Sequence, residues 1–201
     1  MTTLLVSLLL CADPATSQAK TAHYDISAER LDAAEIGRML EQHYVYLERF
    51  FGRAPTSRMR VEVHADLDRY KAALGRDGHS YPGGGGYFAP NTRKAYLFIQ
   101  PSDYFTRHLI LHEATHQFQA LLRTDPVLPR VPWYIEGLAE YFGMHNWDGR
   151  RLEVGIVPAI TLEDYPAKAL KQWEACGGNL EGLIAGRVKD DRALSWAWSI
   201  T

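Results

Sequence analysis

The sequence of 201 residues predicts a single α+β domain that contains a small mixed sheet. Short apolar runs with strand-like alternation are separated by longer stretches whose apolar residues recur at helical spacing. The chain is 46% hydrophobic and 23% charged, which is enough apolar material for one core, and no repeat or shift in composition divides it. We therefore expect one globular unit with helices and strands mixed along the chain.

The first part of the domain is predicted to form two strands and two helices. A strand is expected at residues 23–27, and a long helix follows at 31–51, where Gly52 ends it. Alternating apolar residues predict a second strand at 59–65, followed by a short helix that ends near residue 74.

A glycine-rich stretch and a further strand come next. The stretch PGGGGY at 82–87 lacks the Gly-Lys-Ser/Thr ending of a phosphate-binding loop, so we expect either a flexible lip of a cleft or a plain surface loop. The run KAYLFIQ at 94–100 is a strong strand prediction.

The stretch HLILHEATHQF at 108–118 contains two histidines four residues apart. A Pro-Ser-Asp start signal at 101–103 and apolar residues at helical spacing predict a helix that runs to about Arg123. On such a helix, His112 and His116 lie about 40° apart and project from one face. A zinc ion bound there would need a third protein ligand, an open position for water and a nearby carboxylate, a role that the adjacent Glu113 can fill.

A third ligand is available in VPWYIEGLAEYFG, residues 131–143. A proline at the start and a glycine at the end bracket a second, short helix, on which Glu136 and Glu140 stand one turn apart. The proline-rich segment TDPVLPRVP between the two helices predicts a loop that turns the chain back. Nineteen residues separate His116 from Glu136.

This combination resembles the gluzincin metallopeptidases of the thermolysin-like clan, in which HExxH is followed about twenty residues later by a ligand glutamate. The EGLAEY wording is similar to the EGFA-type segment of zinc aminopeptidases and to the Glu-x-x-x-Asp pair of thermolysin-like enzymes. The order of elements resembles poorly characterised bacterial gluzincin-like proteins. The resemblance implies a zincin-like domain with an HExxH helix and a following glutamate helix. It implies one Zn²⁺ per chain, with the site residues His112, His116 and Glu136 as ligands, Glu113 as general base and Glu140 as the acceptor of an N–H from His112.

The function that the resemblance implies is zinc-dependent hydrolysis of peptide bonds in a peptide or protein substrate, most simply by an endopeptidase. No Gly-x-Met-Glu-Asn element precedes the metal helix, so aminopeptidase activity is not supported. The strand at 94–100 is then either the edge along which an extended substrate pairs or a strand of the sheet core. Candidates for the donor to the tetrahedral oxyanion are Tyr134, Tyr141 and His145. The alternative is a noncatalytic zinc-binding interaction module or an inactive pseudo-peptidase. His108 is expected to be a cleft-edge or structural histidine rather than a fourth ligand.

Charge and the two ends of the chain bound the remaining predictions. The net charge of −2 and the lack of a basic stripe argue against nucleic acid as a partner, and no apolar run is long enough to span a bilayer.

Residues 1–19 resemble a signal peptide, which predicts an exported, periplasmic or secreted protein. The domain is then expected to occupy residues 20–201, and the residues before Lys20 are expected not to pack into it. Cys11 only faintly resembles a lipoprotein anchor. A strand at 151–157, a partly helical segment at 161–175 and a helix at 191–200 complete the chain, and the uncapped last helix favours a domain truncated at its carboxyl end. The sequence leaves the oligomeric state open.

Overall fold

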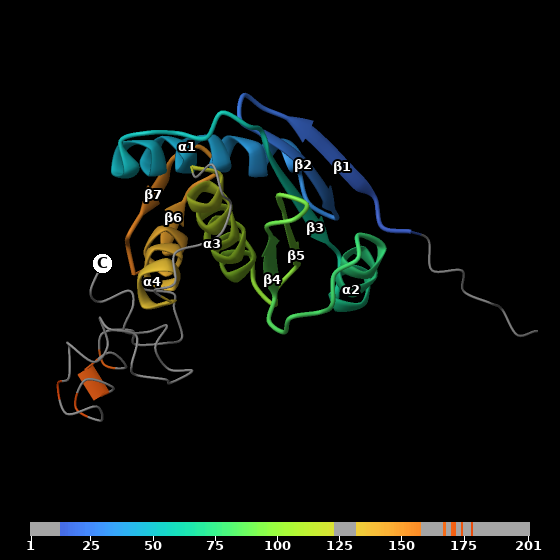
Figure 1. Ribbon diagram of the computed structural model, residues 1–201. Helices are drawn as coiled ribbons and strands as arrows, with labels where there is room; N and C mark the ends of the chain where they lie inside the picture. The colour runs from blue at the N-terminus through green and yellow to red at the C-terminus, as the bar shows by residue number, and fades with distance from the viewer. Residues whose placement is uncertain are drawn as a thin grey trace, which may run out of the picture.

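The computed structural model describes residues 13–122 and 132–157, together with residues 167, 170, 171, 174 and 178. Within these residues a five-stranded mixed sheet is combined with four helices, α1 to α4, and a two-stranded hairpin (Figure 1). The predicted α+β class with a small mixed sheet is confirmed at this level.

The sheet has three parallel strands in its centre and one antiparallel strand at each edge. The central strands follow the order β2, β3, β5, while β1 pairs with β2 and β4 pairs with β5. The bounds of the strands are β1 (Thr16–Lys20), β2 (Tyr24–Glu29), β3 (Met59–His64), β4 (Gly86–Ala89) and β5 (Lys94–Phe98).

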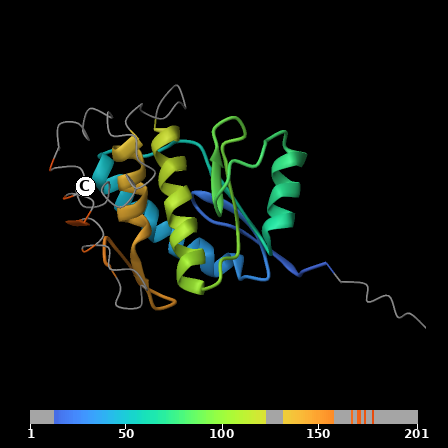
Figure 2. The ribbon, with the colours of Figure 1, turned by 90° about the horizontal axis from the view of Figure 1, so that it is seen from below.

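Helices cover both faces of the sheet (Figure 2). Helices α1 (Ala33–Phe51) and α3 (Asp103–Leu121) lie on one face and α2 (Leu67–Arg76) lies on the other. Successive side chains of β5 point to opposite faces of the sheet. Ala95 and Leu97 therefore belong to the main core, while Tyr96 belongs to the smaller core under α2. Helix α4 (Pro132–Gly143) packs against α3, and the hairpin of β6 (His145–Trp147) and β7 (Leu152–Val154) follows it.

Local signals in the sequence set the helix ends. The side chain of Asp32 accepts a hydrogen bond from the backbone N–H of Ala34 at 2.8 Å, which caps α1, and Gly52 ends it at φ 66°. Helix α3 begins after Ser102, whose hydroxyl accepts a hydrogen bond from the N–H of Phe105 at 3.2 Å. The predicted start of the histidine helix is therefore confirmed. None of the described helices is long and apolar enough to cross a membrane.

The amino-terminal edge of the sheet corrects one prediction. Residues before Lys20 were expected to lie outside the domain, yet residues 16–19 pair with β2 in register, with Thr16 opposite Glu29. The hydroxyl of Ser17 also donates a hydrogen bond to the backbone oxygen of Leu31 at 2.6 Å. The strand was missed because an edge strand can be polar, and the sequence TSQAK shows no apolar alternation. The predicted apolar leader segment at 4–12, Cys11 and the helix at 191–200 lie outside the described residues.

The position of β5 decides between the two interpretations of residues 94–100. This strand pairs with β3 on one side and with β4 on the other, so it lies inside the sheet and cannot be the edge that pairs with a substrate. The sheet-core interpretation is confirmed. The edge near α3 is β4, which begins within the glycine-rich stretch that was predicted to be a loop.

Candidate metal centre

Three side-chain atoms from helices α3 and α4 converge at one point. The Nε2 atoms of His112 and His116 lie 3.0 Å apart, and Oε2 of Glu136 lies 3.5 Å from the first and 3.4 Å from the second. The two histidines stand one turn apart on α3, and α4 packs alongside and carries the glutamate. The predicted convergence of these three residues is therefore present in the structure.

The triangle formed by these three atoms, called the ligand triangle below, has the size that a tetrahedral zinc site requires. Bonds of about 2.1 Å to nitrogen and oxygen, at tetrahedral angles, place neighbouring ligand atoms about 3.4 Å apart. The three separations of 3.0, 3.4 and 3.5 Å agree with that spacing. Two imidazole nitrogens and one carboxylate oxygen can thus hold one metal ion and leave a fourth position for another group.

The other ring nitrogen of His112 is held from α4. Its Nδ1 atom lies 3.2 Å from Oε1 of Glu140, which is the position that a carboxylate needs to orient a ligand imidazole. The second oxygen of Glu140, Oε2, lies 3.4 Å from Nε2 of His108, one turn earlier on α3. His108, Glu140 and His112 therefore form a continuous chain of polar contacts that leads to the ligand triangle.

The electrostatics of the site favour a bound cation. Burial lowers the pKa of His112, but contacts with Glu136 and Glu140 outweigh burial and hold this pKa well above its ordinary value. Burial raises the pKa values of the two glutamates, but the neighbouring histidines outweigh it and hold both values well below the usual range. The two carboxylates are thus ionised in a partly buried place. A metal cation would balance their charge.

The remaining acid of the motif, Glu113, points from α3 to the edge strand β4. It is only 6% exposed, and burial raises its pKa, although the charges of the two ligand histidines oppose that effect. Its carboxylate accepts a hydrogen bond from the backbone N–H of Phe88. A Cβ atom at Gly86 would lie 2.8 Å from Oε1 of Glu113, so only glycine allows the acid to lie this close to the strand.

Access to the triangle is open on one side. The side chains of His112 and His116 are 12% and 9% exposed, whereas the side chain of Glu136 is 36% exposed. The ligand set is therefore anchored in the protein but reachable from solvent at the glutamate.

No family model, no curated protein and no solved structure matches this chain. What can be said of the site therefore comes from its own residues and geometry.

For two of the three predicted oxyanion donors, the structure describes contacts with other parts of the protein. The ring of Tyr141 lies against Gly155, where an added Cβ would come within 2.5 Å of Cζ of the tyrosine. His145 is buried, its Nδ1 atom is 2.8 Å from the backbone oxygen of Gly143, and its ring stacks on Tyr104 at 4.8 Å. The donor roles of Tyr141 and His145 stay predictions. The donor role of Tyr134 stays a prediction.

The sequence alone did not point to two residues that complete the site. His108 was expected to be a structural or cleft-edge histidine, and its contact with Glu140 depends on how closely α3 and α4 pack. Gly86 belongs to the glycine-rich stretch predicted to be either a flexible lip of a cleft or a plain surface loop, and its approach to Glu113 is not part of that prediction. A periodicity argument does not show either role, because both arise from the approach of two elements that are distant in the sequence.

Proposed function

We propose that this protein is a zinc-dependent peptidase that hydrolyses internal peptide bonds of peptide or protein substrates. The observation that carries the proposal is the convergence of His112, His116 and Glu136, with the Glu113 carboxylate placed beside them at the sheet edge. Glu113 is a further buried acid that is not one of the three converging ligands, and a site that only binds metal would not require it.

Zinc is the metal that this donor set favours. Two neutral imidazole nitrogens, one carboxylate oxygen and an open fourth position are the usual arrangement of a catalytic zinc site. When bound, zinc would supply a Lewis acid that polarises the scissile carbonyl and lowers the pKa of water. His112, His116 and Glu136 would hold it, and Glu140 would fix the orientation and raise the basicity of the His112 ring.

Glu113 is the proposed general base. Its raised pKa, caused mainly by burial, suits a carboxylate that takes a proton from the attacking water and passes it to the leaving nitrogen. The hydrogen bond from the N–H of Phe88 fixes the position of the carboxylate.

Strand β4 offers a place for an extended substrate. In an antiparallel pair the backbone groups of alternate residues point away from the partner strand. Because the N–H of Phe88 points to Glu113, the peptide groups of Gly86 and Phe88 lie on the side of β4 that faces away from β5. A substrate strand that pairs along this edge would pass beside the general base.

One observation favours the alternative, a zinc-binding module without turnover. Among the described residues, the ring of Tyr141 lies against Gly155 and that of His145 stacks on Tyr104, so both candidate donors contact other parts of the protein. Such a module would bind zinc with the same three ligands and would not depend on Glu113.

The substitution Glu113→Gln separates the two functions. It keeps the shape of the side chain and all three ligands, so zinc content and thermal stability should match the wild type. Cleavage of unfolded casein or of a peptide library should fall by at least roughly 100-fold, because general-base catalysis typically contributes 10²- to 10⁴-fold. Equal cleavage by both proteins would exclude Glu113 as the base. No cleavage by zinc-loaded wild type would favour the noncatalytic module.

A further inference from the structure

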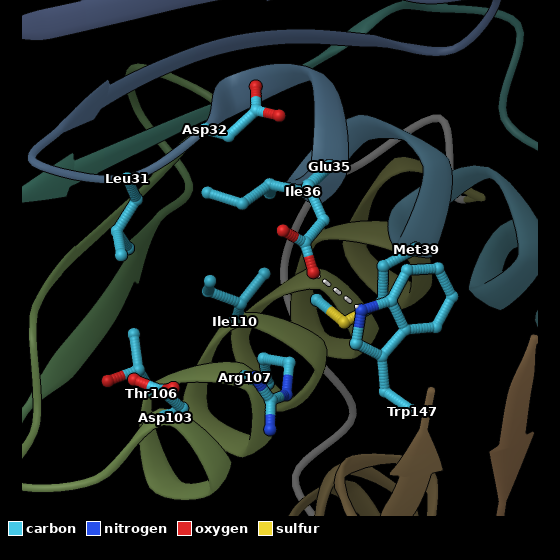
Figure 3. A pocket seen from close by; sticks show the side chains of 10 residues that line it. All are labelled: Leu31, Asp32, Glu35, Ile36, Met39, Asp103, Thr106, Arg107, Ile110 and Trp147. Carbon is cyan, nitrogen blue, oxygen red and sulfur yellow. Dashed lines mark hydrogen bonds between the residues drawn. The ribbon is translucent and has the colours of Figure 1, made fainter. Parts of the chain in front are cut away.

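A cavity of about 170 Å³ lies between α1, α3 and β6 (Figure 3). None of its lining residues is a ligand or the proposed base of the metal centre. On α3 it is lined by Asp103, Thr106, Arg107 and Ile110, which recur every three or four residues on one face of the helix.

Opposite charges face this cavity from two helices. The carboxylate of Glu35 extends inward from α1, and its Oε1 atom accepts a hydrogen bond from Nε1 of Trp147 at 2.9 Å (Figure 3). Arg107 lies on the α3 side, and its Nε atom is buried without a hydrogen-bond partner. No ion pair within 4.0 Å joins Arg107 to Glu35 or to the other two acids of the lining, all of which are described residues.

An arginine beside three carboxylates would ordinarily pair with one of them. A buried polar group without a partner is destabilising, and Nε of Arg107 is such a group, so the guanidinium beside this cavity lacks a partner from the protein. The planar fork of arginine fits a carboxylate in particular. Glu35 has a second oxygen for which no hydrogen bond appears among the described residues, and it is suited to an ammonium group.

The surface between these charges is apolar. Leu31, Ile36, Met39 and Ile110 line it, and the Trp147 ring closes one side (Figure 3). A ligand that makes complementary contacts with Glu35, with Arg107 and with the apolar side chains must therefore carry an ammonium group, a carboxylate and a hydrocarbon part of modest size.

We infer that this cavity is a binding site for a small zwitterion, a free α-amino acid with an apolar side chain. Its ammonium group contacts Glu35, its carboxylate contacts Arg107, and its side chain packs against the aliphatic wall. Since the lining has three carboxylates and one arginine, a simple carboxylic acid is repelled unless it also carries an ammonium group. The site is independent of the metal centre and does not rest on the proposed peptidase function.

Calorimetric titration with L-leucine tests the inference. Two analogues remove one charge each: 3-methylbutylamine lacks the carboxylate, and 4-methylpentanoate lacks the ammonium group. Each should bind at least roughly tenfold more weakly than leucine, because each loses a charge-assisted hydrogen bond. Arg107→Met should weaken leucine binding at least tenfold without weakening the binding of 3-methylbutylamine, which gains from the loss of a positive charge. Glu35→Gln should weaken the binding of both leucine and the amine.

Arg38→Met is the matched control, since Arg38 is exposed on the same helix as Glu35, and it should bind leucine as the wild type does. Glu136→Ala should also bind leucine normally, which keeps this test separate from the metal centre. The absence of saturable leucine binding up to about 10 mM in the wild type would overturn the inference. Equal affinity for leucine and 3-methylbutylamine would overturn it too, and so would undiminished leucine binding by a folded Arg107→Met variant.

Discussion

The Nδ1 atom of His112 lies 3.2 Å from Oε1 of Glu140, while its Nε2 atom lies 3.5 Å from Oε2 of Glu136. One imidazole thus lies between two carboxylates that stand one turn apart on α4. Because Glu140 takes the N–H of Nδ1, the lone pair of a neutral ring lies on Nε2, where the other two converging atoms are. A single helix therefore supplies both a candidate ligand and the carboxylate that would orient a second one.

Weaker metal binding is the expected result of Glu140→Gln. The amide keeps the shape of the side chain but loses the charge that raises the basicity of His112, and loss of such an outer partner typically costs 10- to 100-fold in metal affinity. Competition with a fluorescent zinc chelator measures this affinity. Glu48→Gln, an exposed glutamate on α1, is the control and should leave the affinity unchanged. Unaltered zinc affinity in Glu140→Gln would show that the contact with His112 does not act on the metal.

A methyl group at Gly86 should disturb the proposed general base, Glu113, without disturbing the candidate metal ligands. The new Cβ would lie 2.8 Å from both Cγ and Oε1 of Glu113, and this buried carboxylate would have to leave its bond with the N–H of Phe88. We expect Gly86→Ala to retain zinc and to lower peptide cleavage at least roughly tenfold, within the range that a general base contributes.

Gly75→Ala provides the comparison for this substitution. Nothing lies within 4 Å of a Cβ at this helical position, so the variant should keep full activity. If Gly86→Ala cleaved peptides as fast as Gly75→Ala, the close approach of Glu113 to β4 would have no part in the reaction.

Acid should destabilise the fold through His43. This side chain is fully buried on α1, and burial lowers its pKa to about 3. Between pH 6.5 and that value the unfolded chain binds a proton that the folded chain does not, so the free energy of unfolding falls as the pH falls. From pH 7 to pH 5 the contribution is up to about 2 kcal/mol.

Urea unfolding of the metal-free protein at the two pH values measures this effect. His43→Gln should lose less stability between pH 7 and pH 5 than the wild type, because the titrating group is gone. Burial also lowers the pKa of His145, to about 4, but this residue is present in both proteins. Its contribution to the pH dependence of the free energy of unfolding therefore cancels in the comparison. Identical pH dependence of wild type and variant would contradict the assignment to His43.

The candidate ligands could be predicted from the sequence because their geometry is local. His112 and His116 lie on one face of any helix that contains them, and the cap at Ser102 and the start at Pro132 bound the two helices that matter. The pairing of α3 with α4 was indicated by the proline-rich segment that turns the chain back and by the resemblance to a family, and the two helices do pack together in the structure.

The edges of the sheet could not be predicted in the same way. Strand β1 is polar and β4 begins among glycines, so neither carries the alternation that identifies β2 or β3. Both strands exist because a neighbouring strand offers free hydrogen-bonding groups, which is a tertiary effect. The same holds for the cavity beside Arg107, since its walls come from three separate elements.

The metal content of the purified protein tests the central claim most directly. Wild-type protein, dialysed against buffer with trace zinc, should carry about one zinc per chain by atomic emission, because three protein ligands converge on one position. Glu136→Ala should retain far less under the same conditions, while Glu48→Ala should match the wild type. Stoichiometric zinc in Glu136→Ala, or no zinc in a folded wild type, would contradict the metal centre described above.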